Sequence, residues 1–218
     1  MISDDERFRV FMEAAGCIPG GVPEEIRKTA AADHVPVIRR STQDLLRVIL
    51  AAKKPETVLE VGTAVGFSAV FICSCSGASV VTIENNGERI RTARKNFEKA
   101  GMSDRIRLIE GDAEQVLPGL KGPFDLIFLD AAKGQYIAYV PDVLRLLAPG
   151  GILLADNVLQ EGEILDSRYA VDRRNRTIHR RIREFIRAVS VHPDLETAVL
   201  PLGDGLSVSV KKTGTRPV

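Results

Sequence analysis

Short apolar segments alternate with longer segments of helical periodicity through most of the chain, and this alternation constrains the fold more than any other feature. Strands are expected at 57–61, 79–84, 106–110, 124–129 and 151–155, and helices near 67–75, 87–100, 135–147 and 174–189. Two further strands, near 196–201 and 206–210, are joined by Gly203-Asp204-Gly205, which predicts an antiparallel hairpin at a sheet edge. The prediction is an α/β fold whose seven-stranded, mostly parallel sheet is covered by helices on both faces.

The length and charge of the chain are those of an ordinary globular protein. Its 218 residues carry a net charge of +1, and they suffice for a single domain over 1–218. Within it we expect a core at 35–212 and a helical appendage at 1–34, broken at Gly16–Pro23, which covers a site or pairs with another subunit in a homodimer. The polar first residues and the absence of a long apolar run predict no signal peptide, no membrane contact and a cytoplasmic location.

Two of the predicted strands end in side chains that carry oxygen ligands. The strand 124–129 ends in Asp130, with Lys133 three residues later, and the strand 151–155 ends in Asp156-Asn157. Because ligands bind at the carboxyl ends of strands in an open parallel sheet, we expect these side chains to share one crevice. Two carboxylates and an amide oxygen suit Mg²⁺. The alternative is that Asp130 caps a helix and Asp156-Asn157 forms a turn.

The first three strands end in residues that predict a pocket for an adenosine group. Gly62 and Gly66 follow the first strand, and their Gly-x-x-x-Gly spacing lacks the fingerprint of a dinucleotide or triphosphate site. Glu84 ends the second strand about twenty residues later, where an acid binds ribose hydroxyls. Asp112 follows the third strand and can accept a hydrogen bond from the adenine amine, although each acid alone could be a helix cap. Adenosine without phosphates indicates S-adenosylmethionine.

The segments 58–62, 82–84, 129–133 and 155–158 together resemble the metal-dependent O-methyltransferases, a family that includes catechol and caffeoyl-CoA methyltransferases and bacterial relatives. The resemblance covers roughly residues 35–210 and implies a Rossmann-like class I methyltransferase fold. It implies that Asp130, Asp156 and Asn157 bind the metal and that Lys133 is the catalytic base. The expected cofactor contacts are Ile38, Glu60, Gly62, Thr63, Ser68, Glu84, Asp112, Ala113 and Asp130.

The segment from Arg168 to Arg187 holds eight arginines against two acids, although the whole chain is nearly neutral. In the predicted helix, Ile178, Ile182, Phe185, Ile186 and Val189 form the expected core stripe, and arginines recur along another face. Such a face is usually solvated, but this concentration of charge also suits a polyanion. The candidate RNA contacts are Arg39, Arg40, Arg173, Arg174, Arg176 and Arg180.

Within the family, the segments 38–46 and 173–178 look most like bacterial tRNA 5-hydroxyuridine methyltransferases. The resemblance therefore implies a Mg²⁺- and S-adenosylmethionine-dependent enzyme that methylates 5-hydroxyuridine in tRNA to 5-methoxyuridine. One alternative is a small catechol-type acceptor, since aromatic residues for base stacking are scarce. Another is a nucleoside- or RNA-binding module without turnover, which would not need the four polar residues at 130, 133, 156 and 157.

Overall fold

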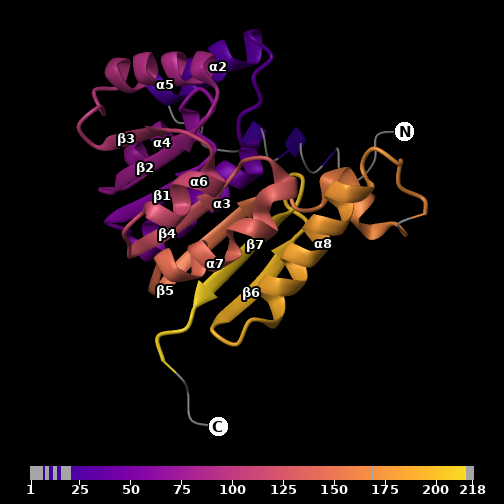
Figure 1. The fold of residues 1–218 in the computed structure, drawn as a ribbon. Coiled ribbons are helices and arrows are strands. Elements are labelled where there is room, and N and C mark those ends of the chain that lie inside the picture. The colour runs from indigo at the N-terminus through magenta and orange to yellow at the C-terminus, as the bar shows by residue number, and fades with distance from the viewer. Residues whose placement is uncertain (1–6, 8–9, 12–13, 16–20, 168, 215–218) are drawn as a thin grey trace.

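The computed structural model describes residues 7, 10–11, 14–15, 21–167 and 169–214, and it contains the predicted seven-stranded sheet (Figure 1). The strand order is β3-β2-β1-β4-β5-β7-β6. The strands are β1 (Thr57–Val61), β2 (Ser79–Glu84), β3 (Ile106–Glu110), β4 (Phe124–Leu129), β5 (Leu147–Asp156), β6 (Leu195–Leu200) and β7 (Leu206–Lys211). All run in one direction except β7, which is antiparallel to both β5 and β6. The α/β fold class, the mostly parallel sheet and the hairpin are thus confirmed.

Helices cover both faces of the sheet, as the alternation predicted (Figure 1). The helices α2 (Val22–Ala32), α3 (Arg40–Lys53), α4 (Phe67–Cys75) and α5 (Gly87–Lys99) border one core. The helices α6 (Ala113–Val116), α7 (Tyr136–Leu146) and α8 (Arg176–Val191) border the other. Successive strand residues point to opposite faces, so that Phe128 belongs to the first core whereas Ile127 and Leu129 belong to the second.

The strand β5 begins at Leu147, four residues before the predicted start. Leu147 pairs with Phe124 of β4, and the register then shifts before Leu126 pairs with Ile152. The extra residues at 148–151 include a proline and two glycines, and they form an irregular extension of the strand.

The second half of the predicted appendage is an integral part of the core. The helix α2 begins at Val22, inside the predicted break, with Pro23 in its first turn, where a missing N–H costs nothing. Ile26 and Ala30 of this helix are buried in the first core. Most residues before Gly21 lie outside the described ranges, so the predicted helical break at 16–20 falls there too. Among the described residues, no helix has the length and apolar character that crossing a membrane requires.

The buried stripe of α8 differs from the predicted one at its first position. His179, Ile182, Phe185 and Val189 are buried, whereas Ile178 is 37% exposed. His179, and not Ile178, takes the buried position, because Nε2 of His179 lies 3.2 Å from the backbone oxygen of Asp166. The polar ring therefore has a hydrogen-bond partner inside the protein. The prediction that Ile178 belongs to the core stripe was therefore wrong, and the buried residue is the next one, His179.

Candidate active site

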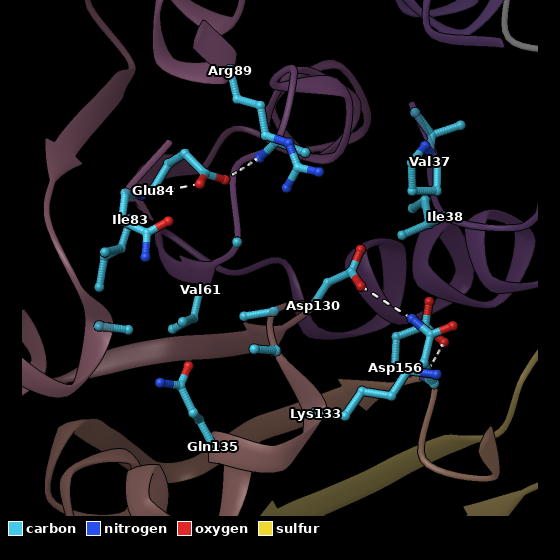
Figure 2. Close-up of a pocket in the computed structure, with 18 of the residues that line it drawn as sticks. Val37, Ile38, Val61, Ile83, Glu84, Arg89, Asp130, Lys133, Gln135 and Asp156 are labelled. Atoms are coloured by element: carbon cyan, nitrogen blue, oxygen red, sulfur yellow. Dashed lines mark hydrogen bonds between the residues drawn. The ribbon is translucent and has the colours of Figure 1, made fainter. Parts of the chain in front are cut away.

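A cavity of about 610 Å³ opens at the carboxyl ends of the parallel strands. Its walls come from the segments that follow β1 to β5, from the arm 35–39 that precedes α3, and from Asp204 in the β6–β7 turn. Figure 2 shows Ile83 and Glu84 at one end of this cavity, Lys133 and Asp156 at the other, and Asp130 between them. The sheet therefore gathers the two halves of the predicted site into a single space.

The glycine turn after β1 lets the backbone of two strands approach closely. Gly62 has a φ of +105°, and a Cβ at this position would lie 2.0 Å from the backbone oxygen of Asp130. Only glycine combines this backbone conformation with this contact. The turn therefore forms a shallow cradle at the floor of the cavity, of the kind that a ligand requires when it approaches the main chain.

Glu84 is fixed at the end of β2, where the sequence placed it. Its carboxylate accepts hydrogen bonds from the backbone N–H groups of Ala64 (2.9 Å), Asn85 (3.0 Å) and Asn86 (2.9 Å). Asp112 and Ala113 also line the cavity, and Asp112 in addition caps α6 by accepting from the N–H of Glu114. Asp112 therefore caps a helix, as the alternative interpretation had it, and also lines the pocket.

Three of the predicted cofactor contacts lie behind the cavity wall instead of lining it. Glu60, Thr63 and Ser68 are buried, with Glu60 fully inaccessible. The Thr82 hydroxyl donates to Glu60 and also shares a hydrogen bond with the hydroxyl of Thr63. Burial raises the pKa of Glu60 to about 7, and the hydrogen bonds from Ser68 and Thr82 offset this rise only in part. These residues form a buried polar layer beneath the glycine turn.

The two carboxylates and the amide predicted to bind a metal do come together. Nδ2 of Asn157 lies 3.1 Å from Oδ1 of Asp130, and the backbone N–H of Asn157 donates to Oδ1 of Asp156 at 2.8 Å (Figure 2). Burial and then the charge of Asp156 raise the pKa of Asp130 to about 7, and burial also raises that of Asp156. A cation would relieve this crowding of negative charge, and the oxygen donors match the preference of Mg²⁺. Within the described ranges, no group of three His, Cys, Asp or Glu residues could hold a metal ion, so a site here would have to combine the two aspartates with the amide of Asn157.

Lys133 has an ion-pair partner that the sequence reasoning did not assign to the site. Its Nζ lies 2.9 Å from Oδ2 of Asp204, a buried carboxylate in the turn between β6 and β7. The turn is held against the segment after Asn157, because the N–H groups of Val158 and Leu159 donate to the carbonyls of Gly205 and Asp204. In the sequence, Asp204 is marked only by its place between two glycines, and we interpreted that pattern as a hairpin turn.

The arm before α3 contributes one wall of the cavity. Ile38 and Arg39 line it, as expected for a cofactor contact and for a basic group near the entrance. Arg40 does not, since it belongs to α3 and pairs with Asp44 at 3.6 Å. The two adjacent arginines therefore have different environments, and only Arg39 faces the site.

Many arginines of the basic segment bind other parts of the chain. Arg176 donates to the carbonyl of Val171 (3.1 Å), and Arg180 pairs with Glu184 (2.7 Å). The remaining contacts are those of Arg181 with the Gly134 carbonyl, Arg183 with the Ile164 carbonyl, and Arg174 with Asp172 at 3.9 Å. Arg173 and Arg187 are exposed and have no such partner in the part of the chain that the structure describes, whereas Arg168 lies outside that part. None of the arginines of this segment that the structure describes lines the cavity.

The fold and the cavity together define a class I methyltransferase architecture, and comparisons with known proteins agree. A family model described as O-methyltransferase matches residues 22–212. A catechol O-methyltransferase from Mycobacterium tuberculosis is 37% identical over 153 residues, covering 67% of this chain and 70% of that protein. A caffeoyl-CoA O-methyltransferase from Citrus natsudaidai is 29% identical over 201 residues, covering 87% of each. A methyltransferase from Podospora anserina, solved with S-adenosylhomocysteine, superposes with a TM-score of 0.85 at 28% identity, covering 95% of each chain.

This chain belongs to the O-methyltransferase family. It is an enzyme, an S-adenosylmethionine-dependent O-methyltransferase.

Proposed function

We propose that this enzyme methylates one hydroxyl of a small, catechol-type acceptor with two vicinal oxygens, with the help of a divalent cation. One observation carries the proposal: Asp130, Lys133, Asp156 and Asn157 lie at one end of the same cavity whose other end holds Glu84. An acceptor and a methyl donor can thus meet inside a single space. The proposal also agrees with the names of the relatives in the comparison, two of which act on catechol or caffeoyl-CoA.

The cofactor fits the end of the cavity formed by β1, β2 and β3. Glu84 would bind the ribose hydroxyls, and Asp112 would accept from the adenine amine beside the small Ala113. The cradle at Gly62 allows the amino-acid portion of the cofactor to approach the main chain. The sulfonium would then face Asp130, which lies between the two ends of the cavity.

The metal would be held by Asp130, Asp156 and Asn157, whose crowded carboxylates fit a divalent cation. When bound, it would supply positive charge that lowers the pKa of the acceptor hydroxyl. Lys133 is the candidate acceptor of the hydroxyl proton, and Asp204 holds its Nζ at the rim of the cavity. The enclosing walls orient the acceptor oxygen toward the methyl group, so that proximity supplies much of the rate enhancement.

The test of the metal site uses the variant Asp156→Ala. We expect S-adenosylmethionine to bind with unchanged affinity by calorimetry, because the adenosine end of the cavity is untouched, while turnover with added Mg²⁺ collapses. Asp172→Ala, at an exposed acid before α8, is the matched control and should keep full activity. Methyl transfer by the wild type that continues undiminished in EDTA would rule out the metal.

A second candidate acceptor, 5-hydroxyuridine in tRNA, is favoured by the exposed arginines before α8 and by one contact of α8 with the segment that carries Lys133. Arg173 and Arg174 are exposed, and Arg181 of α8 contacts the carbonyl of Gly134, next to Lys133. One arginine of the basic segment thus contacts the residue that follows Lys133. The contacts of Arg176 and Arg180 within the chain weaken this candidate, since these side chains already have partners.

The two acceptors are separated by the double variant Arg173→Gln/Arg174→Gln, which spares the internal contact of Arg176. If the arginines bind phosphates, tRNA affinity should fall and its log–log salt slope should flatten by about 0.7 per lost contact on single strands. Activity on a free catechol should persist. Arg94→Gln, at an exposed arginine of α5 that pairs with Glu110, is the control. An unchanged salt slope, together with turnover of catechol, would exclude tRNA as the acceptor.

A further inference from the structure

The strands β4 and β5 separate at the point where each presents a carboxylate to the cavity. The last registered pair between them is Leu129 with Ala155. Beyond it, the N–H of Asp130 donates to the Val61 carbonyl of β1 at 2.9 Å, and Asp156 pairs with Leu206 of β7. Asp130 and Asp156 therefore bond to strands on opposite sides, and no backbone hydrogen bond joins them in the structure described.

The side chain of Tyr136, at the start of α7, contacts the backbone of both strand ends instead. Its hydroxyl lies 3.2 Å from the carbonyl of Leu129 and 3.2 Å from the carbonyl of Asp156. It also accepts a hydrogen bond from the N–H of Ala131 at 3.2 Å. The three backbone groups belong to the two residues that flank Asp130 and to Asp156 itself. The hydroxyl thus links β4 and β5 just beyond the point where their backbone hydrogen bonding ends.

The position of this hydroxyl is fixed by the core beneath it. The Tyr136 side chain is fully buried, and its ring packs edge-on against Phe185 of α8 with the centroids 5.5 Å apart. A phenylalanine would fill the same apolar space, so packing alone does not require the oxygen. Tyr139, on the same helix, shows the contrast, because its hydroxyl contacts only the side chain of Gln135 and neither strand end.

We propose that Tyr136 is a positioning residue that sets the separation of Asp130 and Asp156 for a divalent cation. The inference rests on the metal site of the proposed function. Without the hydroxyl, the described contacts between the two strand ends beyond the Leu129–Ala155 pair are reduced to the one between the side chains of Asn157 and Asp130, the two groups that would hold the cation. The carboxylates then lose their fixed spacing, and the cation loses affinity even though every ligand is still present. Outer groups that orient metal ligands typically contribute about 10- to 100-fold to metal affinity.

The test measures Mn²⁺ binding by electron paramagnetic resonance in the absence of acceptor. We expect Tyr136→Phe to weaken Mn²⁺ binding about tenfold or more, while its affinity for S-adenosylmethionine without metal stays that of the wild type. Tyr139→Phe is the matched control, because it removes a hydroxyl from the same helix that contacts Gln135 and neither strand end. It should leave Mn²⁺ affinity unchanged.

Each other outcome decides a specific point. If Asp156→Ala abolishes Mn²⁺ binding but Tyr136→Phe binds as tightly as the wild type, the metal site stands and the role of Tyr136 is refuted. If Tyr136→Phe and Tyr139→Phe weaken Mn²⁺ binding equally, the loss does not depend on the contact with the strand ends and the proposal is overturned. If wild type and Asp156→Ala bind Mn²⁺ alike, the metal site itself fails, and the inference with it. Should Tyr136→Phe melt near the assay temperature, saturating S-adenosylhomocysteine stabilises the folded state for the same measurement.

Discussion

Glu60 should make the stability of this protein depend on pH in the physiological range, and Glu60→Gln should remove that dependence. The carboxyl group is fully inaccessible, and burial raises its pKa to about 7 from its ordinary value of 4.5. A shift of one unit corresponds to about 1.4 kcal/mol. The pKa difference between the folded and unfolded chain is therefore linked to about 3 kcal/mol of stability.

The sign follows from which state of the protein holds the proton. Between pH 4.5 and 7 the unfolded chain has lost the proton of Glu60 and the folded chain keeps it, so the folded state binds more protons. Stability contributed by this group is thus fully present below pH 4.5 and falls as the pH rises toward 7. Glutamine keeps the shape and an oxygen that accepts from Thr82 but does not ionise.

The assay is urea unfolding of the cofactor-free protein at several values between pH 4.5 and 8. The difference in unfolding free energy, variant minus wild type, should rise by about 3 kcal/mol across this range, because only the wild type has to ionise a buried group. The same change at Glu196, an exposed carboxylate of β6, is the control for the substitution itself. A difference that stays constant with pH would refute the reasoning, since Glu60 would then ionise alike in both states.

Three further predictions concern the site. Lys133→Ala should lower kcat by about two to four orders of magnitude in a methyl-transfer assay. Lys133→Arg should not restore kcat, because guanidinium stays protonated, and a near-normal kcat of the Arg variant would mean that Lys133 is not the base. Asp204→Asn removes the carboxylate that holds Nζ of Lys133 in place, so kcat should fall about tenfold with KM for S-adenosylmethionine unchanged, and an equal change in both constants would contradict a role limited to the lysine. Gly62→Ala forces a Cβ against the Asp130 carbonyl at a positive φ, and it should lower the free energy of unfolding in denaturant by about 3–5 kcal/mol. Gly77→Ala, whose Cβ would meet nothing within 4 Å, should leave that free energy nearly unchanged, and equal losses in the two variants would disprove the close approach.

Hydrophobic periodicity predicted the strands well because it is a local property. The runs 57–61, 79–84, 106–110 and 124–129 match β1 to β4 residue for residue. The strands β1, β2 and β4 are mostly buried on both faces, so the apolar run and the strand coincide, whereas the edge strand β3 is only partly buried. The same local signal erred where tertiary contacts decide. In α8, the choice between Ile178 and His179 depended on the Asp166 carbonyl, which lies on a different segment.

By itself, the sequence determined which side chains stand at the ends of the strands, and therefore that Glu84, Asp130, Asp156 and Asn157 share one edge of the sheet. This follows from strand polarity alone, because parallel strands present their carboxyl ends together. Function at the level of the family was also accessible, since the polar residues at these ends follow the strands directly in the chain.

Only the tertiary structure decided which distant groups hold these side chains in place. Asp204 meets Lys133 across 71 residues because β7 runs antiparallel to β5, which brings the hairpin turn to the mouth of the cavity. Tyr136 joins β4 and β5 because the strands separate just where α7 begins beneath them. Hydrogen bonds of this kind depend on the relative placement of elements far apart in the chain, and local periodicity carries no information about that placement.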